Sequence, residues 1–226
     1  MRAIPTTMAL ACLLCGTALT GCAADDSAAT KSAADLLDDA NRTMRGLRSV
    51  TVETTNTSAR GTVKSRLSTD LKERCRAKVT WTGNGSLEQI RIGKTDYVRP
   101  DDTYLEHWSG RKIEGLRPKR WVKQPADRAQ PGDGLTTCTW QFDSFGEAEK
   151  GESLHIGGRE AIGLRVKDKA DKQGTYTFYV ATEGKPYLLR VAYRSDANVT
   201  TTSFSAFDEP VDIQPPAAST VLDAAR

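Results

Sequence analysis

Few of the residues that could carry out chemistry in this chain stand at catalytic or metal-binding spacing. The two histidines, His107 and His155, lie neither in an H-E-x-x-H motif nor beside paired cysteines at zinc-ligand spacing. The adjacent carboxylates Asp25-Asp26, Asp38-Asp39 and Asp101-Asp102 point apart because they are neighbours in sequence, so they do not form an opposed acid and base. The G-x-S-x-G, P-loop and G-x-G-x-x-G motifs do not occur. We therefore predict no catalytic residue, no metal site and no cofactor.

The cysteines point to export rather than to redox chemistry. Cys12 and Cys15 form a C-x-x-C motif, but they lie within residues 8–19, an apolar run that has the length of a signal peptide and is too short to span a bilayer. The motif is therefore interpreted as part of a segment that is removed on export.

The apolar run ends in Leu19-Thr-Gly-Cys22, which resembles the bacterial lipobox. In that motif the cysteine receives a diacylglyceryl group and the chain is cut just before it. Two buried acyl chains, at about 0.8 kcal/mol per methylene, anchor a protein stably. The sequence thus predicts a signal peptide at residues 1–21 and attachment through Cys22 to the extracytoplasmic face of the cell membrane. The alternative is an ordinary secretory signal that a cysteine follows by chance.

After cleavage and acylation, Cys75 and Cys138 are the two thiols left in an oxidising compartment. This predicts a disulfide between them, which stabilises the fold by about 4 kcal/mol in the chain-entropy model. Two buried free thiols are the alternative.

The small net charge of the chain disfavours binding to polyanions, whether nucleic acid or an acidic membrane surface. The 32 Lys and Arg residues nearly match the 29 Asp and Glu residues, giving a net charge of +3. Removal of residues 1–21 takes away one Arg and no acid, which leaves 31 basic against 29 acidic residues, or +2. Basic runs interleaved with aromatics do not occur, so we predict no nucleic-acid partner.

The mature chain begins with a flexible acylated tether at residues 22–32, which are small and polar. Ser32 and Asp35 then have capping-box spacing. An amphipathic helix over 33–47 is predicted from apolar residues at helical spacing, namely Leu36, Leu37, Ala40, Met44 and Leu47.

Beyond the helix, the hydrophobic period changes to two. In residues 71–81, Cys75, Ala77 and Val79 alternate with basic residues. Similar alternation recurs near 63–67, 162–166, 176–180, 187–193 and 198–206, with turn signals between the runs. Short hairpins make neighbouring strands antiparallel. We therefore predict a meandering antiparallel sheet with one apolar face and one basic, polar face.

Two further segments differ from this pattern. Residues 101–150 combine aromatics with Pro118, Pro125, Pro131 and nearby glycines, which predicts short helices or a lid rather than sheet. Together with the N-terminal helix they would cover the apolar face. The domain is predicted to span 33–214, and residues 215–226 are predicted to be a disordered tail.

Several segments resemble actinobacterial lipoproteins related to the LolA and LppX/LprAFG group, and the resemblance covers roughly residues 33–214. They are Thr95-Asp-Tyr-Val-Arg99, Arg120-Trp-Val-Lys123, Ile156-Gly-Gly-Arg159, Thr177-Phe-Tyr-Val-Ala181, Gly184-Lys-Pro-Tyr-Leu-Leu-Arg190, Phe204-Ser-Ala-Phe-Asp208 and Val211-Asp-Ile213. The resemblance implies an α+β fold, in which a curved antiparallel half-barrel sheet wraps over an N-terminal helix and short lid helices. It also implies an apolar cavity, because characterised members carry lipids or acylated lipoproteins.

The leading functional hypothesis is therefore a lipid-anchored protein that binds or carries a lipid or other hydrophobic ligand between sheet and helices. The candidate cavity residues are Leu36, Met44, Val79, Trp81, Tyr97, Tyr104, Trp108, Trp121, Trp140 and Phe142. A filled core is the alternative interpretation of these side chains. A non-catalytic signalling or scaffold lipoprotein that binds the ectodomain of an envelope protein is the alternative function, and an envelope hydrolase is a third.

Overall fold

The computed structural model describes residues 28, 30–109, 120–130, 132–144, 146–168, 171 and 173–223. The predicted signal peptide and Cys22 lie outside these residues. The helical elements are α1 (Ala33–Arg45), α2 (Asp102–Ser109), η1 (Ala126–Arg128) and η2 (Ala218–Thr220). The strands are β1 (Val50–Ser58), β2 (Gly61–Thr69), β3 (Arg74–Trp81), β4 (Gly85–Ile92), β5 (Thr95–Pro100), β6 (Trp121–Pro125), β7 (Glu147–Ile156), β8 (Arg159–Lys167), β9 (Gly174–Ala181), β10 (Leu188–Ser195), β11 (Asn198–Ser205) and β12 (Val221–Asp223).

Helix α1 begins with the predicted capping box. The Ser32 hydroxyl accepts a hydrogen bond from the Asp35 N–H at 3.1 Å, and the Asp35 carboxylate accepts one from the Ser32 N–H at 3.3 Å. Hydrogen bonds from Ser32 hold the pKa of Asp35 below its usual value. The helix ends at Arg45 rather than at the predicted residue 47, because Gly46 caps its last turn.

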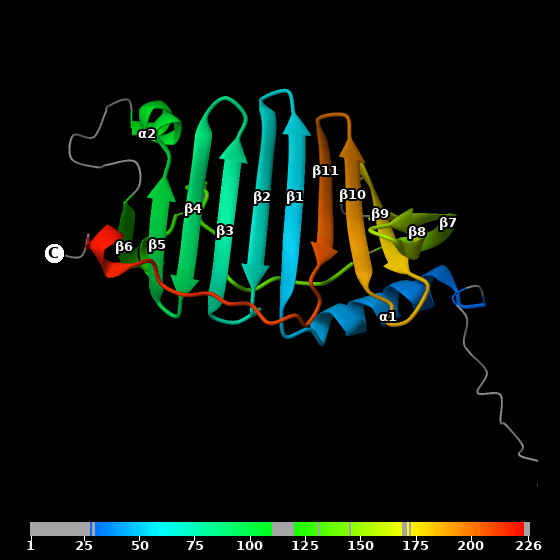
Figure 1. The fold of residues 1–226 in the computed structure, drawn as a ribbon. Helices are drawn as coiled ribbons and strands as arrows, with labels where there is room; N and C mark the ends of the chain where they lie inside the picture. The colour runs from blue at the N-terminus through cyan, green and yellow to red at the C-terminus, as the bar shows by residue number, and fades with distance from the viewer. Residues whose placement is uncertain are drawn as a thin grey trace, which may run out of the picture.

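The twelve described strands form one open sheet in the order β12-β6-β5-β4-β3-β2-β1-β11-β10-β9-β8-β7 (Figure 1). All neighbouring strands are antiparallel except β12, which runs parallel to β6. Strands β1 to β6 follow one another from the middle of the sheet toward one edge. Strand β7 lies at the opposite edge, and β8 to β11 follow inward from it, so that β11 pairs with β1. The predicted antiparallel α+β architecture is confirmed, and the sheet does not close into a barrel.

The two faces of the sheet differ in what covers them. We call the face against α1 the inner face. There α1 buries Leu36, Leu37, Ala40 and Met44 in a cluster with the inner-face side chains of β8 and β9, including Leu164 and Phe178. The opposite, outer face is turned to the viewer in Figure 1.

An extended segment, residues 132–144, covers the part of the inner face that α1 leaves open, and we call it the strap. Cys138 of the strap forms a disulfide with Cys75 of β3, with 5.2 Å between their Cα atoms. At its far end, Ser144 accepts a hydrogen bond from the Asn41 side chain of α1 at 2.7 Å. The strap therefore continues the layer that α1 begins.

The stretch 101–150 thus differs from its prediction. Among its described residues, only Asp102–Ser109 forms an α-helix, while Trp121–Pro125 is a strand of the sheet and the strap is extended. The cover over the apolar face is therefore not a set of lid helices. The proline and glycine residues that exclude a helix here also allow an extended path.

The C-terminal segment, residues 206–217, crosses the outer face (Figure 1). Its Ile213 packs with Ile90 and Trp121 in a second apolar cluster, and the Arg74 guanidinium donates a hydrogen bond to the Ile213 carbonyl. The chain then forms η2 and β12, which pairs with β6. The structure thus differs from the predicted tail at residues 218–223, because the edge of β6 offers backbone partners that a sequence pattern does not display.

We predict that a Cys75→Ala/Cys138→Ala variant loses about 4 kcal/mol of its free energy of unfolding, because the disulfide closes a loop with a sequence separation of 63 residues. Chemical denaturation with and without dithiothreitol measures this. The reductant should lower the stability of the wild type to that of the variant and leave the variant unchanged. Equal stability of the oxidised wild type and the variant would contradict the prediction.

Candidate functional site

The principal hollow of functional interest, which we call the cleft, lies between the inner face and the strap and has a volume of about 390 Å³. Its sheet side is formed by the apolar side chains Val52, Val63, Leu67, Ala77, Val79 and Trp81 of β1, β2 and β3. Its strap side is formed by Gly132, Gly134, Leu135, Thr136 and Trp140. This volume is within the range of small-molecule binding sites.

The register of β2 and β3 places these side chains on one face. Val63 pairs with Trp81 and Leu67 pairs with Ala77. Because strand side chains alternate between the two faces, the basic residues between them point to the outer face. The alternation predicted for residues 71–81 is thus the local cause of the apolar floor of the cleft.

Hydrogen bonds as well as the disulfide hold the strap to the sheet. The side-chain amide of Gln89 accepts from the Thr136 N–H at 2.9 Å and donates to the Thr136 carbonyl at 3.1 Å. The Thr69 hydroxyl donates to the Cys138 carbonyl. These side chains form hydrogen bonds with backbone groups of the strap, as the backbone of a neighbouring strand would.

A buried ion pair orients Gln89. Arg91 contacts Asp96 through two hydrogen bonds, at 2.7 and 2.6 Å, and Gln89 donates to Asp96 at 2.9 Å. The Asp96 side chain is fully buried, and its hydrogen bonds raise the pKa of Arg91. A bidentate charged pair with an additional donor satisfies both groups, so this polar cluster fixes the Gln89 amide beneath the strap.

Aromatic side chains form a rim at one end of the cleft. The ring centroid of Trp81 lies 5.5 Å from that of Tyr104 and 6.0 Å from that of Trp108, both on α2. Burial raises the pKa of Tyr104, whose hydroxyl donates to the Asp133 carbonyl of the strap at 3.2 Å. Trp108 is 53% exposed. The rim therefore extends from the floor of the cleft to solvent.

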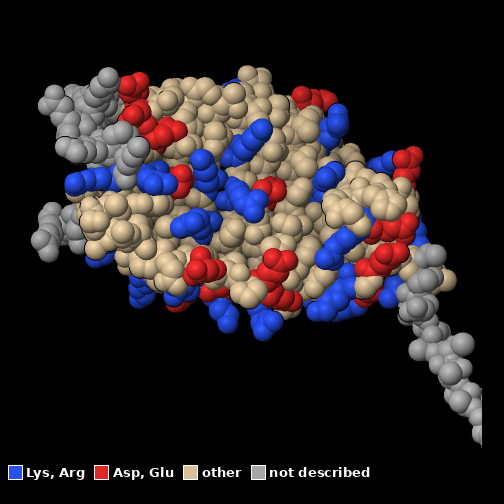
Figure 2. Space-filling view, in the orientation of Figure 1, with Lys and Arg blue, Asp and Glu red and all other residues tan. Residues whose placement is uncertain are grey.

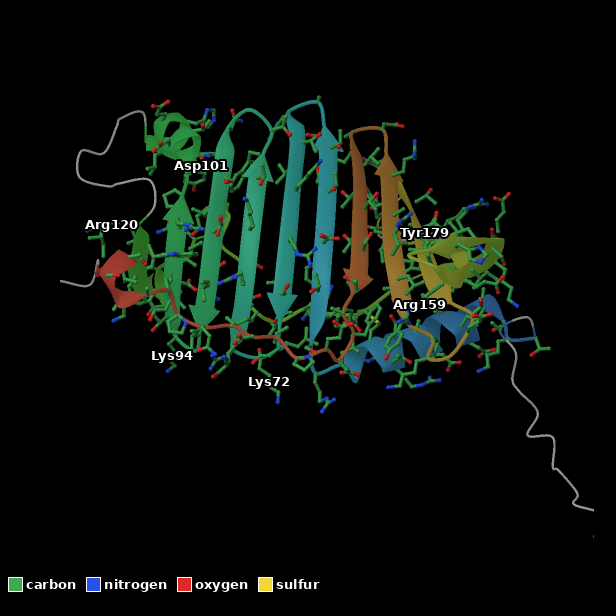
Figure 3. The ribbon with its side chains drawn as sticks, in the orientation of Figure 1. Lys72, Lys94, Asp101, Arg120, Arg159 and Tyr179 are labelled. Carbon is green, nitrogen blue, oxygen red and sulfur yellow. A yellow bond between two sulfur atoms is a disulfide. The ribbon has the colours of Figure 1, made fainter. Side chains whose placement is uncertain are left out.

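Asp101 positions α2 and its aromatic residues. Its carboxylate accepts hydrogen bonds from the Tyr104 N–H and from the Ser86 hydroxyl, both at 2.8 Å. Partial burial raises the pKa of Asp101, but these hydrogen bonds outweigh burial and leave the pKa below its usual value. Asp101 lies at the base of α2 in Figure 3, where it caps the helix.

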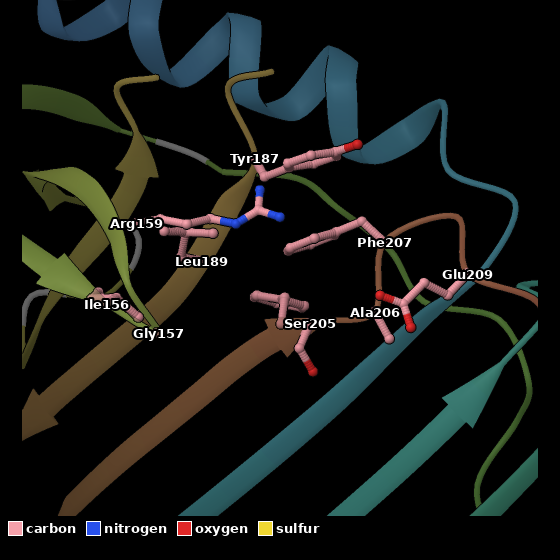
Figure 4. A pocket seen from close by; sticks show the side chains of 10 residues that line it. Ile156, Gly157, Arg159, Tyr187, Leu189, Ser205, Ala206, Phe207 and Glu209 are labelled. Carbon is pink, nitrogen blue, oxygen red and sulfur yellow. The ribbon is translucent and has the colours of Figure 1, made fainter. Parts of the chain in front are cut away.

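Two further hollows lie outside the cleft. One, of about 320 Å³, lies on the other side of Trp140 and is lined by Met44, Leu47, Leu71 and Phe142 among others. The other, of about 190 Å³, is shown in Figure 4. There the Arg159 guanidinium lies 5.6 Å from the ring centroid of Tyr187, which stacks on Phe207. Trp140 thus separates two apolar spaces under the sheet.

The predicted cavity residues fall into four groups. Val79, Trp81 and Trp140 line the cleft, and Tyr104 and Trp108 form its rim. Leu36, Met44 and Phe142 are buried in the core beneath α1, where Met44 and Phe142 also line the smaller hollow, while Tyr97 and Trp121 pack in the outer-face cluster.

Tyr97 and Trp121 are therefore not brought into the cleft. The hairpin pairs Ile90 with Tyr97 and Arg91 with Asp96, so Arg91 and Asp96 face inward and Tyr97 faces outward. Trp121 lies under the C-terminal segment, with the Arg99 guanidinium 4.6 Å from its ring centroid. The alternation of faces in residues 71–81 can be continued through β4 and the two-residue turn at Gly93-Lys94 into β5. Continued in this way, it predicts that Tyr97 lies on the outer face.

Chemistry that needs metal or paired catalytic groups is not apparent in the described residues. No group of three His, Cys, Asp or Glu side chains there is arranged to hold a metal ion. His107 and His155 are both exposed, and His107 packs edge-on against Trp108. The helices of the described part are too short or too polar to cross a membrane.

Solved structures with a similar fold include two mycobacterial proteins. LprF from Mycobacterium bovis superposes with a TM-score of 0.59 and 15% identity, over 82% of this chain and 97% of the LprF chain. The lipoprotein LppX from Mycobacterium tuberculosis superposes with a TM-score of 0.53 and 14% identity, over 81% of this chain and 100% of the LppX chain. This chain has the fold of LprF and LppX. The resemblance drawn from the sequence segments is thus confirmed at the level of the fold, while no protein-family model and no curated protein sequence matches the chain.

Within this LppX-like fold, sequence reasoning missed the small and polar residues of the site. Val63, Leu67 and Ala77 line the cleft, and Gln89 holds the strap, yet none was a candidate. The alternation of β2 and β3 could have identified the first three. Gln89 carries no comparable signal, because a polar residue on an apolar face becomes interpretable only when its partner is known.

Gly134 allows the strap to approach Trp81 closely. Its φ is +81°, and a Cβ there would overlap the Trp81 ring. We predict that Gly134→Ala lowers the free energy of unfolding by about 2–4 kcal/mol, from the left-handed backbone and the overpacking together, and shifts the fluorescence of Trp81.

Gly132→Ala is the matched control for this variant. Gly132 has a φ of +89°, but nothing lies within 4 Å of a Cβ there. This variant should lose only about 1 kcal/mol, the cost of the left-handed backbone. Equal losses in urea denaturation would show that the approach to Trp81 contributes nothing.

Proposed function

We propose that this chain is a membrane-anchored extracytoplasmic lipoprotein that binds a lipid or other hydrophobic ligand in the cleft, without catalysis. The observation that supports it best is the apolar cleft of about 390 Å³ between the inner face and the strap. The fold shared with LprF and LppX, and the lipid-carrying role that the sequence resemblance implies, support the same function.

The energetics favour an acyl chain as the ligand. Each buried methylene contributes about 0.8 kcal/mol, so about ten methylenes contribute about 8 kcal/mol. That corresponds to a micromolar complex before the entropic cost of immobilising the ligand is subtracted. The aromatic rim offers a route from solvent along Trp108 and Trp81 to Val79 at the floor.

The ligand is best sought in a chain that carries no covalent lipid of its own. A mature Cys22→Ser form, purified without detergent and extracted with organic solvent, should release acyl lipid that mass spectrometry detects. It should also bind a fluorescent fatty acid.

Val79→Trp fills the cleft, whereas Thr80→Trp adds the same side chain to the outer face of the same strand. We predict that Val79→Trp lowers fatty-acid affinity at least tenfold and removes the extractable lipid, while Thr80→Trp changes affinity less than twofold. Thermal unfolding establishes that both variants fold. Equal effects of the two substitutions, or a wild type without lipid and without affinity, would reject lipid binding in the cleft. A protein partner retained by the Val79→Trp variant would favour the scaffold function instead.

The anchor is tested separately. The wild type expressed in a bacterium that processes lipoproteins should partition into the detergent phase of Triton X-114, because two acyl chains anchor it. Cys22→Ser should move it to the aqueous phase. A Cys22→Ser chain that remains in the detergent phase would refute lipid attachment at this residue.

A further inference from the structure

The outer face of the sheet concentrates positive charge that the near-neutral composition conceals. Alternation and register place eight cations but only two carboxylates on the outer face of the central strands β1–β5 and β9–β11. The cations are Lys64, Arg66, Arg74, Arg76, Lys78, Arg99, Arg190 and Arg194, and the carboxylates are Glu53 and Glu88. Figure 2 shows Lys and Arg gathered over the middle of this face, with most acidic groups toward its margins.

Five of these eight cations have no carboxylate partner among the described residues. Glu53 pairs with Arg66, and Glu88 pairs with Lys78 and Arg99. Of the other five, Arg74 donates a hydrogen bond to the Ile213 backbone carbonyl. The unpaired cations are Lys64, Arg76, Arg190 and Arg194, and the buried Nε of Arg190 has no hydrogen-bond acceptor.

A hollow of about 360 Å³ lies within this basic surface, over β11, β1, β2 and β3. Three cations line it, Lys64, Arg66 and Lys78, and Glu53 is the single carboxylate among its lining residues. Hydroxyl donors on the same face, including Thr55, Thr80 and Thr201, complete the lining. Cationic and hydroxyl donors around one hollow suit the oxygens of a phosphate group.

We propose that the outer face docks on the anionic phospholipid headgroups of the membrane surface, with a lipid phosphate in this hollow. The choice of a bilayer rests on the anchor in the proposed function. The ten residue-to-residue steps from Cys22 to Ser32 reach at most about 35 Å, so an anchored domain stays close to the headgroups, and its effective concentration there is high. Docking in this way turns the cleft, on the inner face, away from the bilayer.

The experiment uses the mature Cys22→Ser chain and sedimentation with vesicles, so that the acyl anchor plays no part. Vesicles of phosphatidylglycerol and phosphatidylcholine in equal amounts should bind it at least tenfold more tightly than phosphatidylcholine alone. Binding should fall at least tenfold between 50 and 500 mM NaCl, because salt screens exposed charges.

Two triple variants with equal net charge distinguish the effect of charge on the outer face from the effect of overall net charge. Lys64→Glu/Arg76→Glu/Arg194→Glu reverses charge on the outer face, and Arg60→Glu/Lys72→Glu/Lys94→Glu reverses it in turns at the strand ends, where Figure 3 shows Lys72 and Lys94. Each takes the mature chain from +2 to −4. The outer-face variant should lose at least tenfold in affinity and the turn variant less than threefold.

Equal losses in the two variants, or no binding to anionic vesicles at 50 mM NaCl, would overturn the proposal. Binding of soluble polyphosphate without binding of vesicles would overturn it too, since it would assign the face to another polyanion. The Val79→Trp variant should bind anionic vesicles like the wild type, so failure of the cleft as a lipid site leaves this result unaffected. Failure of the lipid anchor is detected separately, by Triton X-114 partitioning of the wild type and the Cys22→Ser form.

Discussion

The width of one apolar sheet face is the constraint on which the rest of the structure depends. Twelve strands at about 4.8 Å spacing make a sheet about 50 Å wide, whereas a helix of 13 residues is about 20 Å long. Helix α1 therefore covers only one side of the inner face. The strap covers the other side, and the Cys75–Cys138 disulfide holds it there. Because an extended segment presents fewer apolar side chains than a helix, space remains beneath it, and the cleft is that space.

The same alternation that makes the cleft also makes the outer face. Along β2 and β3 each apolar residue that points inward is followed by a polar or basic residue that points outward. A chain with a net charge of only +3 thereby acquires a strongly basic surface. The two candidate surfaces of this protein, one for a hydrophobic ligand and one for anionic headgroups, are opposite faces of the same strands.

The sequence could predict what local patterns determine. Ser32 and Asp35 predicted the start of α1, and the alternation around Cys75 predicted β3. The two cysteines that remain beyond the predicted signal peptide and Cys22 predicted the disulfide. Properties that depend on residues far away in the sequence could not be predicted from local patterns. The face of Tyr97 follows from hairpin register, where a slip of one residue exchanges the faces. The role of Gln89 depends on a strap that lies 47 residues further along the chain.

The central position of β1 has a consequence for how the molecule assembles. Strands β1–β6 and β7–β11 are two series of hairpins that can each form locally, but they are joined by the β1–β11 ladder, in which Thr54 pairs with Thr202. Synthesis proceeds from the N-terminus, so β1 has an open hydrogen-bonding edge until almost the whole chain has been made. An open edge is a template for pairing between molecules. The speed with which β11 arrives thus sets how long a newly delivered chain is vulnerable to aggregation.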